Sequence, residues 1–140
     1  MLKSVTSFAK VILPLGALAV TVGIVGAQDP VLTPQEAVST YDTDKDGTID
    51  ETEVQNAAGA TFDKLDVDHD GTLDQKELHG RMNAAQFREA DPDNDKTLTK
   101  SEYTVFVGKA FRRANPDNDG TVDARELATP AGRSLLILMR

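Results

Sequence analysis

The sequence predicts an all-α protein, a compact bundle of three-helix type that carries four acidic loops. Three observations support this fold class. Four acidic segments of twelve residues recur along the chain, the connectors between them are only twelve or thirteen residues long, and two connectors carry apolar residues at helical spacing. A connector of this length has no room for two helices and a turn, so a single helix has to join two loops. The 140 residues suit one small domain.

The composition is acidic and lacks cysteine. The chain has 15 basic and 23 acidic residues, which gives a formal net charge of -8. The absence of cysteine excludes disulfide bridges and zinc-thiolate sites. An acidic chain repels nucleic-acid phosphates and anionic lipid headgroups, so we expect no nucleic-acid partner and no membrane-surface partner. Metal cations are the partners that this charge favours.

The first 27 residues have the pattern of a secretory signal peptide. They contain no acidic residue, and two lysines precede an apolar run that Pro14 and Gly16 interrupt. We expect cleavage after Ala27, because the alternative, an uncleaved membrane anchor, needs ~20 apolar residues. The sequence therefore predicts a signal peptide at residues 1–27, one domain at residues 28–140, and export. In a Gram-negative bacterium the protein would be periplasmic.

The first predicted element of the mature chain is a helix that begins at Pro34. Thr33 and Glu36 have the spacing of a capping box, and proline suits the first helical position. This helix leads into the first acidic loop.

The four acidic loops, loops 1 to 4, occupy residues 42–53, 66–77, 91–102 and 115–126 and read DTDKDGTIDETE, DVDHDGTLDQKE, DPDNDKTLTKSE and NPDNDGTVDARE. This is the EF-hand pattern, in which oxygens at positions 1, 3, 5, 7, 9 and 12 converge on one hard cation. Position 7 offers its backbone carbonyl and position 12 a bidentate carboxylate. The candidate metal ligands are Asp42, Asp44, Asp46, Thr48, Asp50, Glu53, Asp66, Asp68, Asp70, Thr72, Asp74, Glu77, Asp91, Asp93, Asp95, Thr97, Thr99, Glu102, Asn115, Asp117, Asp119, Thr121, Asp123 and Glu126.

Four matches in phase argue against ordinary acidic turns, which are the alternative for segments rich in Asp and Gly. Of the 23 acidic residues, 18 fall at these ligand positions. Position 6 usually needs glycine for a sharp turn, and loop 3 has Lys96 there, so we expect loop 3 to be the least regular. Position 8 is aliphatic throughout, as in loops that pair through a short β-bridge, and is occupied by Ile49, Leu73, Leu98 and Val122.

Two of the three connectors predict uninterrupted helices. Apolar residues recur at helical spacing in the first connector at Val54, Ala58, Phe62 and Leu65. The third connector has an equivalent face made of Tyr103, Phe106, Val107, Ala110 and Phe111. A rigid helix holds its two loops at opposite ends, so loop 1 cannot pair with loop 2, nor loop 3 with loop 4. We expect loop 1 to pair with loop 4 and loop 2 with loop 3.

The second connector and the C-terminal segment complete the bundle. Gly80 and Asn83 interrupt the second connector, and Asn83 begins a capping-box pattern, so the chain can turn there. Thr129 and Pro130 predict the start of a last helix, whose apolar residues 135–139 should cover the core. A membrane or partner role for that segment is the alternative, but burial preferences favour the core.

With these features the chain from about residue 41 to residue 140 resembles the lanmodulin family, the periplasmic lanthanide-binding proteins of methylotrophic bacteria. The resemblance rests on the signal peptide, the short connectors, the stretch 115–132 and six loop residues, namely Pro92 and Pro116 at position 2, the initial Asn115, and Asp50, Asp74 and Asp123 at position 9. It implies selective binding of trivalent lanthanides over calcium, with a disorder-to-order change, in cells that use lanthanides in alcohol dehydrogenases. The sequence departs from the family pattern at Thr43, Val67, Lys96 and Thr99.

Three functional classes follow. The first is a lanthanide-binding protein that buffers or delivers the metal. The second is a calcium buffer or sensor, although a sensor that grips helices needs a methionine-rich groove and the mature chain has only Met82 and Met139. The third is an enzyme, which we do not expect, because no nucleophile and base are paired and His69 and His79 fit exposed positions better than catalytic ones.

Folding should depend on the metal. Unneutralised carboxylates within a loop repel one another, so the free energy of binding becomes free energy of folding, and we expect a largely disordered metal-free state. We expect a monomer. The sequence identifies no delivery partner.

Overall fold

The computed structural model describes residues 32–140. The predicted signal peptide, with its cleavage position, lies outside the described residues. Ten elements follow one another in the order α1 (Pro34–Tyr41), β1 (Ile49–Asp50), α2 (Glu51–Leu65), β2 (Thr72–Leu73), α3 (Ala84–Ala90), β3 (Leu98–Thr99), α4 (Lys100–Ala114), β4 (Thr121–Val122), α5 (Ala124–Leu127) and α6 (Pro130–Met139).

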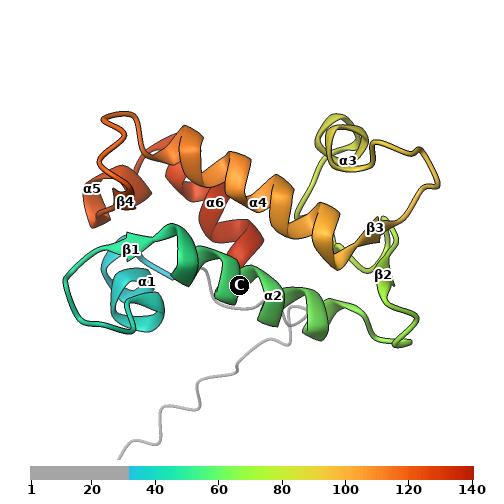
Figure 1. The fold of residues 1–140 in the computed structure, drawn as a ribbon, viewed down its shortest axis with the longest axis horizontal. Coiled ribbons are helices and arrows are strands. Elements are labelled where there is room, and N and C mark those ends of the chain that lie inside the picture. The colour runs from blue at the N-terminus through green and yellow to red at the C-terminus, as the bar shows by residue number, and fades with distance from the viewer. Residues whose placement is uncertain (1–31) are drawn as a thin grey trace, which may run out of the picture.

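The prediction of an all-α protein is confirmed at the level of the fold class. Helices make up most of the regular structure of residues 32–140, and each strand has only two residues. The bundle is more elaborate than the three-helix type expected, because the long helices α2, α4 and α6 are accompanied by the shorter α1, α3 and α5 (Figure 1). Over the described range, no helix is both long enough and apolar enough to cross a membrane.

Local sequence signals set the predicted helix starts. Thr33 caps α1 and Asn83 caps α3, each through a complete capping box, and Thr129 caps α6 with Pro130 at its first position. These three predicted starts are confirmed. Between β2 and α3 the chain forms turns, as the interruption at Gly80 and Asn83 predicts.

Two antiparallel strand pairs lie at opposite ends of α2 and α4 (Figure 1). In one, β1 pairs with β4 and Ile49 is opposite Val122. In the other, β2 pairs with β3 and Leu73 is opposite Leu98. All four aliphatic side chains are fully buried. Each strand pair therefore joins the first half of the chain to the second.

The core lies where α2, α4 and α6 meet. The rings of Phe62 on α2 and Tyr103 on α4 lie 6.1 Å apart between centroids. Four of the five apolar residues expected to cover the core are buried, namely Leu135, Leu136, Leu138 and Met139, whereas Ile137 is half-buried. Each fully buried side chain of this size contributes ~1.5–3 kcal/mol.

The last turn of α6 is hydrogen-bonded by side chains from three other helices. The hydroxyl groups of Tyr41 and Thr61 donate to the carbonyl of Met139, at 2.9 and 2.7 Å, and the hydroxyl of Tyr103 donates to the carbonyl of Leu138, at 2.7 Å. Burial raises the pKa of Tyr103 far above its usual value, so its hydroxyl keeps its proton. These bonds satisfy helix-end carbonyls that would otherwise be buried without a donor.

Candidate metal sites

Acidic side chains converge in three of the four loops. In each of these loops, three carboxylates offer oxygens that all lie within 4.8 Å of one another: Asp42, Asp44 and Glu53 in loop 1, Asp66, Asp68 and Asp70 in loop 2, and Asp91, Asp93 and Glu102 in loop 3. Loop 4, which begins with Asn115, forms no such group of acidic or histidine side chains within residues 32–140. Nine of the predicted ligands are therefore brought together in threes by the folded chain.

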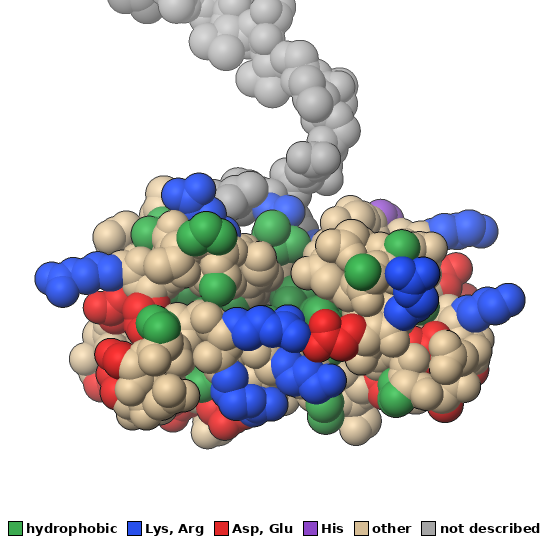
Figure 2. Space-filling model, turned by 90° about the horizontal axis from the view of Figure 1, so that it is seen from above, with side chains coloured by type: hydrophobic (Ala, Val, Ile, Leu, Met, Phe, Trp, Pro, Cys, Tyr) green, Lys and Arg blue, Asp and Glu red, His purple; other side chains and the backbone are tan. Residues whose placement is uncertain are grey.

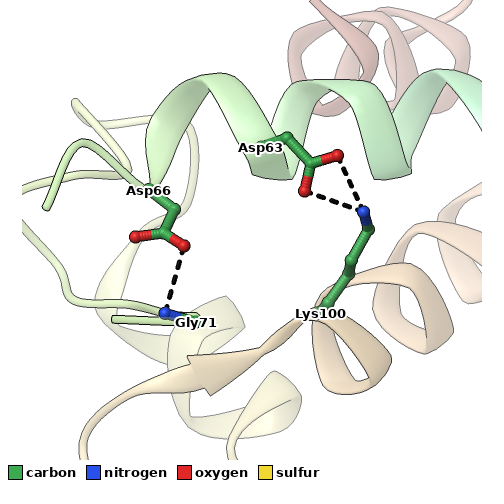
Figure 3. A network of polar contacts seen from close by, with 4 residues as sticks. All are labelled: Asp63, Asp66, Gly71 and Lys100. Carbon is green, nitrogen blue, oxygen red and sulfur yellow. Dashed lines mark hydrogen bonds and ion pairs between the residues drawn. The ribbon is translucent and has the colours of Figure 1, made fainter. Parts of the chain in front are cut away.

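Main-chain amides hold the first side chain of each of the first two loops. In loop 2, the amides of Asp70 and Gly71 donate to the two carboxylate oxygens of Asp66, each at 3.1 Å, and Figure 3 shows the bond from Gly71. In loop 1, the amide of Gly47 donates to Asp42 at 2.8 Å. Burial alone would raise the pKa of Asp42, but the amides that point at it bring the pKa below its usual value.

The loops turn through left-handed residues at positions 4 and 6. At position 6 the glycines of loops 1, 2 and 4 have φ between +87° and +95°. Position 4 is left-handed in every loop although it is never glycine, and is occupied by Lys45, His69, Asn94 and Asn118. In loops 1 and 2 these turns aim successive amides at the first carboxylate, which is the geometry of an anion-binding nest.

The expectation that loop 3 is the least regular is wrong. Lys96 adopts φ +72° at position 6, and its amide donates to Asp91 at 3.1 Å, the same distance as the equivalent bond in loop 2. A non-glycine residue pays about 1–2 kcal/mol for this conformation, which the hydrogen bond and the surrounding loop offset. Lysine therefore keeps the turn that glycine makes in the other loops.

Position 5 of every loop is tied to position 7. The aspartate accepts hydrogen bonds from the amide of the threonine, at 2.8 Å in all four loops, and from its hydroxyl. The pairs are Asp46 with Thr48, Asp70 with Thr72, Asp95 with Thr97 and Asp119 with Thr121. The hydroxyl of each threonine is thus engaged within the loop, which leaves its backbone carbonyl free to act as the predicted metal ligand.

Position 9 of each loop also caps the helix or turn that follows, which the sequence analysis missed. In loop 1, Asp50 accepts from the amide of Glu53 at 2.8 Å, and Glu53 accepts from the amide of Asp50 at 3.0 Å. Asp74, Thr99 and Asp123 exchange the same two bonds with the glutamates of their loops. The signal was present, since D-x-x-E and T-x-x-E are capping-box sequences. One oxygen of each position-9 aspartate is therefore committed to the backbone.

Carboxylates within a loop destabilise one another's charged forms. The amide of Asp46 lowers the pKa of Asp44, but burial and the neighbouring carboxylates Asp46 and Glu53 raise it more, and the net shift is upward. In loop 4, burial raises the pKa of Glu126, and the charges of Asp117 and Asp123 raise it further. A bound cation would remove this repulsion.

Two buried oxygens at the first position of loops 3 and 4 have no hydrogen-bond partner. They are Oδ1 of Asp91 and Oδ1 of Asn115, and each residue is only 4% exposed. An unsatisfied buried polar atom costs about 1–3 kcal/mol. In both loops the atom belongs to the residue predicted to be the first ligand, so a bound cation is the partner that its position fits.

Position 2 divides the loops into two classes. In loops 1 and 2 the amide of Thr43 or Val67 donates to the position-12 glutamate, Glu53 or Glu77. Loops 3 and 4 have proline there, which has no N–H to donate. In the first two loops, an oxygen that a bidentate contact to a metal would use is already occupied.

Replacing Val67 by proline is expected to raise the ion affinity of loop 2 by about two- to fivefold. Proline removes the amide that donates to Glu77 at 3.2 Å and so leaves that carboxylate oxygen to the metal, a change within the ~0.5–1.5 kcal/mol of an ordinary hydrogen bond. The backbone accepts the change, because ψ of Asp66 is 80° and the residues before the two native loop prolines have ψ of 84° and 80°. The measurement is an ion titration followed at the amide of Gly71.

Val67→Ala is the matched control, because it also removes the 69% exposed side chain but keeps the N–H. An equal gain in Val67→Ala, or a weaker site in Val67→Pro, would show that the amide does not compete with the metal.

Comparison with known families supports an EF-hand assignment for the first half of the chain. The EF-hand family matches residues 39–57 and 59–80, which contain loops 1 and 2. None of the curated proteins compared with the chain matches it. Together with the acidic groups, the match indicates metal binding of the EF-hand type, for which calcium is the usual ion.

Proposed function

We propose that the protein binds trivalent lanthanide ions selectively through its four EF-hand loops and buffers or transports them in the periplasm. The observation that carries this proposal is the convergence of three carboxylates to within 4.8 Å in each of loops 1, 2 and 3. The partnerless buried oxygens of Asp91 and Asn115 add support, since a cation gives both a partner.

The charge of the loops favours an ion of charge three. Loops 1 and 2 each have five carboxylates at ligand positions, and loops 3 and 4 each have four. Lanthanide ions are hard and close to calcium in size, but they carry one more charge and therefore tolerate more carboxylates around them. The position-9 aspartates contribute negative charge even with one oxygen committed to capping.

The loops act in two pairs, loop 1 with loop 4 and loop 2 with loop 3. The strand pairs β1 with β4 and β2 with β3 support this arrangement, because the two strands of each pair belong to loops from different halves of the chain. Binding in one loop fixes one strand of a pair and lowers the entropic cost of ordering the other. Filling the sites therefore drives folding of the bundle from a largely disordered metal-free chain.

The remaining parts of the proposal concern the cell. The chain is exported through a signal peptide at residues 1–27, which is removed, and the domain at residues 28–140 acts as a monomer without enzymatic activity. His69 and His79 are exposed and belong to none of the acidic groups described, which suits a binding protein.

The experiment that tests the proposed function is a metal-buffered titration of residues 28–140, followed by far-UV circular dichroism. We expect little helix without metal, and helix formation at free lanthanum or neodymium concentrations many decades below the calcium concentration that has the same effect. Full helix in the metal-free protein would contradict metal-induced folding.

A calcium-binding buffer or sensor is the second candidate, because the family match is to EF hands in general. The same titration separates the two. Comparable midpoints for lanthanum and calcium would support the calcium function and exclude lanthanide selectivity.

A further inference from the structure

The two halves of the chain carry opposite charges at matched positions. An interval of 49 residues relates loop 1 to loop 3 and loop 2 to loop 4, since Asp42 corresponds to Asp91 and Asp66 to Asn115. The same interval relates two charged positions on α2 and α4. Glu51 on α2 corresponds to Lys100 on α4, and Asp63 on α2 corresponds to Arg112 on α4. The helix of the first half is acidic where the helix of the second half is basic.

These four side chains form two ion pairs between α2 and α4. The ammonium group of Lys100 contacts both carboxylate oxygens of Asp63, at 2.7 and 2.8 Å (Figure 3). A guanidinium nitrogen of Arg112 contacts Glu51 at 3.1 Å. The 49-residue relation exchanges one pair for the other, so the two contacts are equivalent under the internal repeat.

Each ion pair joins a residue inside one loop to a residue just before the loop that pairs with it. Lys100 is the tenth residue of loop 3, directly after β3, and Asp63 lies three residues before the start of loop 2. Glu51 is the tenth residue of loop 1, directly after β1, and Arg112 lies three residues before the start of loop 4. The Lys100 contact therefore joins the helix that enters loop 2 to the helix that leaves loop 3, and the Arg112 contact does the same for loops 4 and 1.

Small residues leave room for these side chains across the helix interface. A Cβ at Gly59 of α2 would lie 3.4 Å from Cε of Lys100. A Cβ at Gly108 of α4 would lie 3.0 Å from Nε2 of Gln55 and 3.5 Å from the carboxylate of Glu51. The two glycines are also 49 residues apart. On the same helix α4, Lys109 contacts Glu89 of α3 instead, at 3.9 Å. Figure 2 shows basic side chains beside acidic ones across the middle of one face.

We propose that these ion pairs are positioning contacts that couple ion binding within each pair of loops, Asp63 with Lys100 for loops 2 and 3 and Glu51 with Arg112 for loops 1 and 4. The inference rests on the proposed metal-binding function. The opposite charges favour antiparallel packing of α2, from the first half of the chain, against α4, from the second half. They also keep the two loops of a pair adjacent, so that binding to one lowers the cost of ordering the other.

The size of the effect is modest, and its location is specific. Each side chain is at least half exposed, so loss of one pair should weaken a site only by a small factor. Charge reversal replaces the attraction by repulsion, and we expect the nearby loops to need about three- to tenfold more ion. The loops at the far end of the bundle should be unaffected.

The test is a titration with lanthanum and separately with calcium. The protein is expressed from the full sequence and purified in the form that remains after processing by the cell. Glycine labelled with ¹⁵N reports on three loops, through Gly47 in loop 1, Gly71 in loop 2 and Gly120 in loop 4. The variants are Lys100→Glu and Arg112→Glu. The control is Lys109→Glu, which changes the net charge by the same amount on the same helix but alters a contact to α3.

Compared with the control, Lys100→Glu should raise the midpoint at Gly71 and leave Gly47 and Gly120 within about twofold, the limit for a negligible coupling. Arg112→Glu should give the reverse pattern. The exchanged pair is the double variant with Asp63→Lys and Lys100→Glu, in which the two charges of the contact are interchanged. It should restore the midpoint at Gly71.

Equal shifts at all three glycines, or shifts no larger than those of the control, would overturn the inference. If Lys100→Glu fails to order at any ion concentration, the exchanged pair decides, since restored ordering supports the inference and continued failure overturns it. Wild-type glycine signals that respond to neither ion would instead refute the proposed metal-binding function.

Discussion

Replacing Glu53 by glutamine is expected to lower the ion affinity of loop 1 by at least about 100-fold, because substitutions one shell further from a metal already cost 10–100-fold. Glu53 is 7% exposed and is the predicted bidentate ligand. One of its oxygens accepts from the amide of Asp50, and the other accepts from the amide and hydroxyl of Thr43. Glutamine removes the negative charge. It also replaces one accepting oxygen by an amide nitrogen, which would face N–H or O–H groups that themselves donate hydrogen bonds.

The measurement is a lanthanum titration of Glu53→Gln that counts bound ions and follows the amide of Gly47. We expect one site to be lost or to fill last, with loop 1 unordered until it fills. Glu89→Gln is the control, since Glu89 on α3 contacts Arg113 and Lys109 and lies outside every loop. Unchanged stoichiometry and affinity in Glu53→Gln would show that the ligand assignment for loop 1 is wrong.

The structural features that depend on residues close together in the chain could be predicted from the sequence. The capping residues Thr33, Asn83 and Thr129 are identified by side chains within three positions, so their helix starts could be read directly. The aliphatic residues at position 8 are likewise buried where their spacing predicts. The fold class follows from such local signals combined with the short connectors.

Contacts between distant segments could not be predicted. The bond from Tyr41 to the carbonyl of Met139 joins residues 98 positions apart, and no periodic pattern marks either partner. The orphaned oxygens of Asp91 and Asn115 are equally invisible, because burial of a loop residue depends on what packs over it. The expectation that Lys96 makes loop 3 the least regular was wrong for another reason. The left-handed conformation costs a residue other than glycine about 1–2 kcal/mol, and the other interactions of a loop can offset that cost.

Replacing Gly132 by alanine is expected to give the largest loss of stability of any conservative substitution considered. A Cβ at this position would lie 2.2 Å from the carbonyl oxygen of Glu126 and 2.4 Å from Cα of Leu127. Both are backbone atoms, so no side-chain rotation relieves the clash, and α6 must move away from α5. Overpacking costs about 1–3 kcal/mol even where side chains can adjust, and we expect more than that here.

The displacement should also reach the metal site, because Glu126 is the position-12 residue of loop 4. In the lanthanum-saturated protein, Gly132→Ala should lower the thermal midpoint by more than about 10 °C. It should also weaken binding at loop 4, seen at the amide of Gly120, more than binding at loop 2, seen at Gly71.

Gly59→Ala is the matched control for a methyl group added to a helix. Its nearest contact would be Cε of the flexible Lys100 side chain at 3.4 Å, and alanine improves helix propensity by about 0.5–1 kcal/mol. We therefore expect Gly59→Ala to leave the thermal midpoint unchanged or raised. If Gly132→Ala behaved in the same way, α5 and α6 could not be packed as closely as the structure has them, and the last helix would not control the geometry of loop 4.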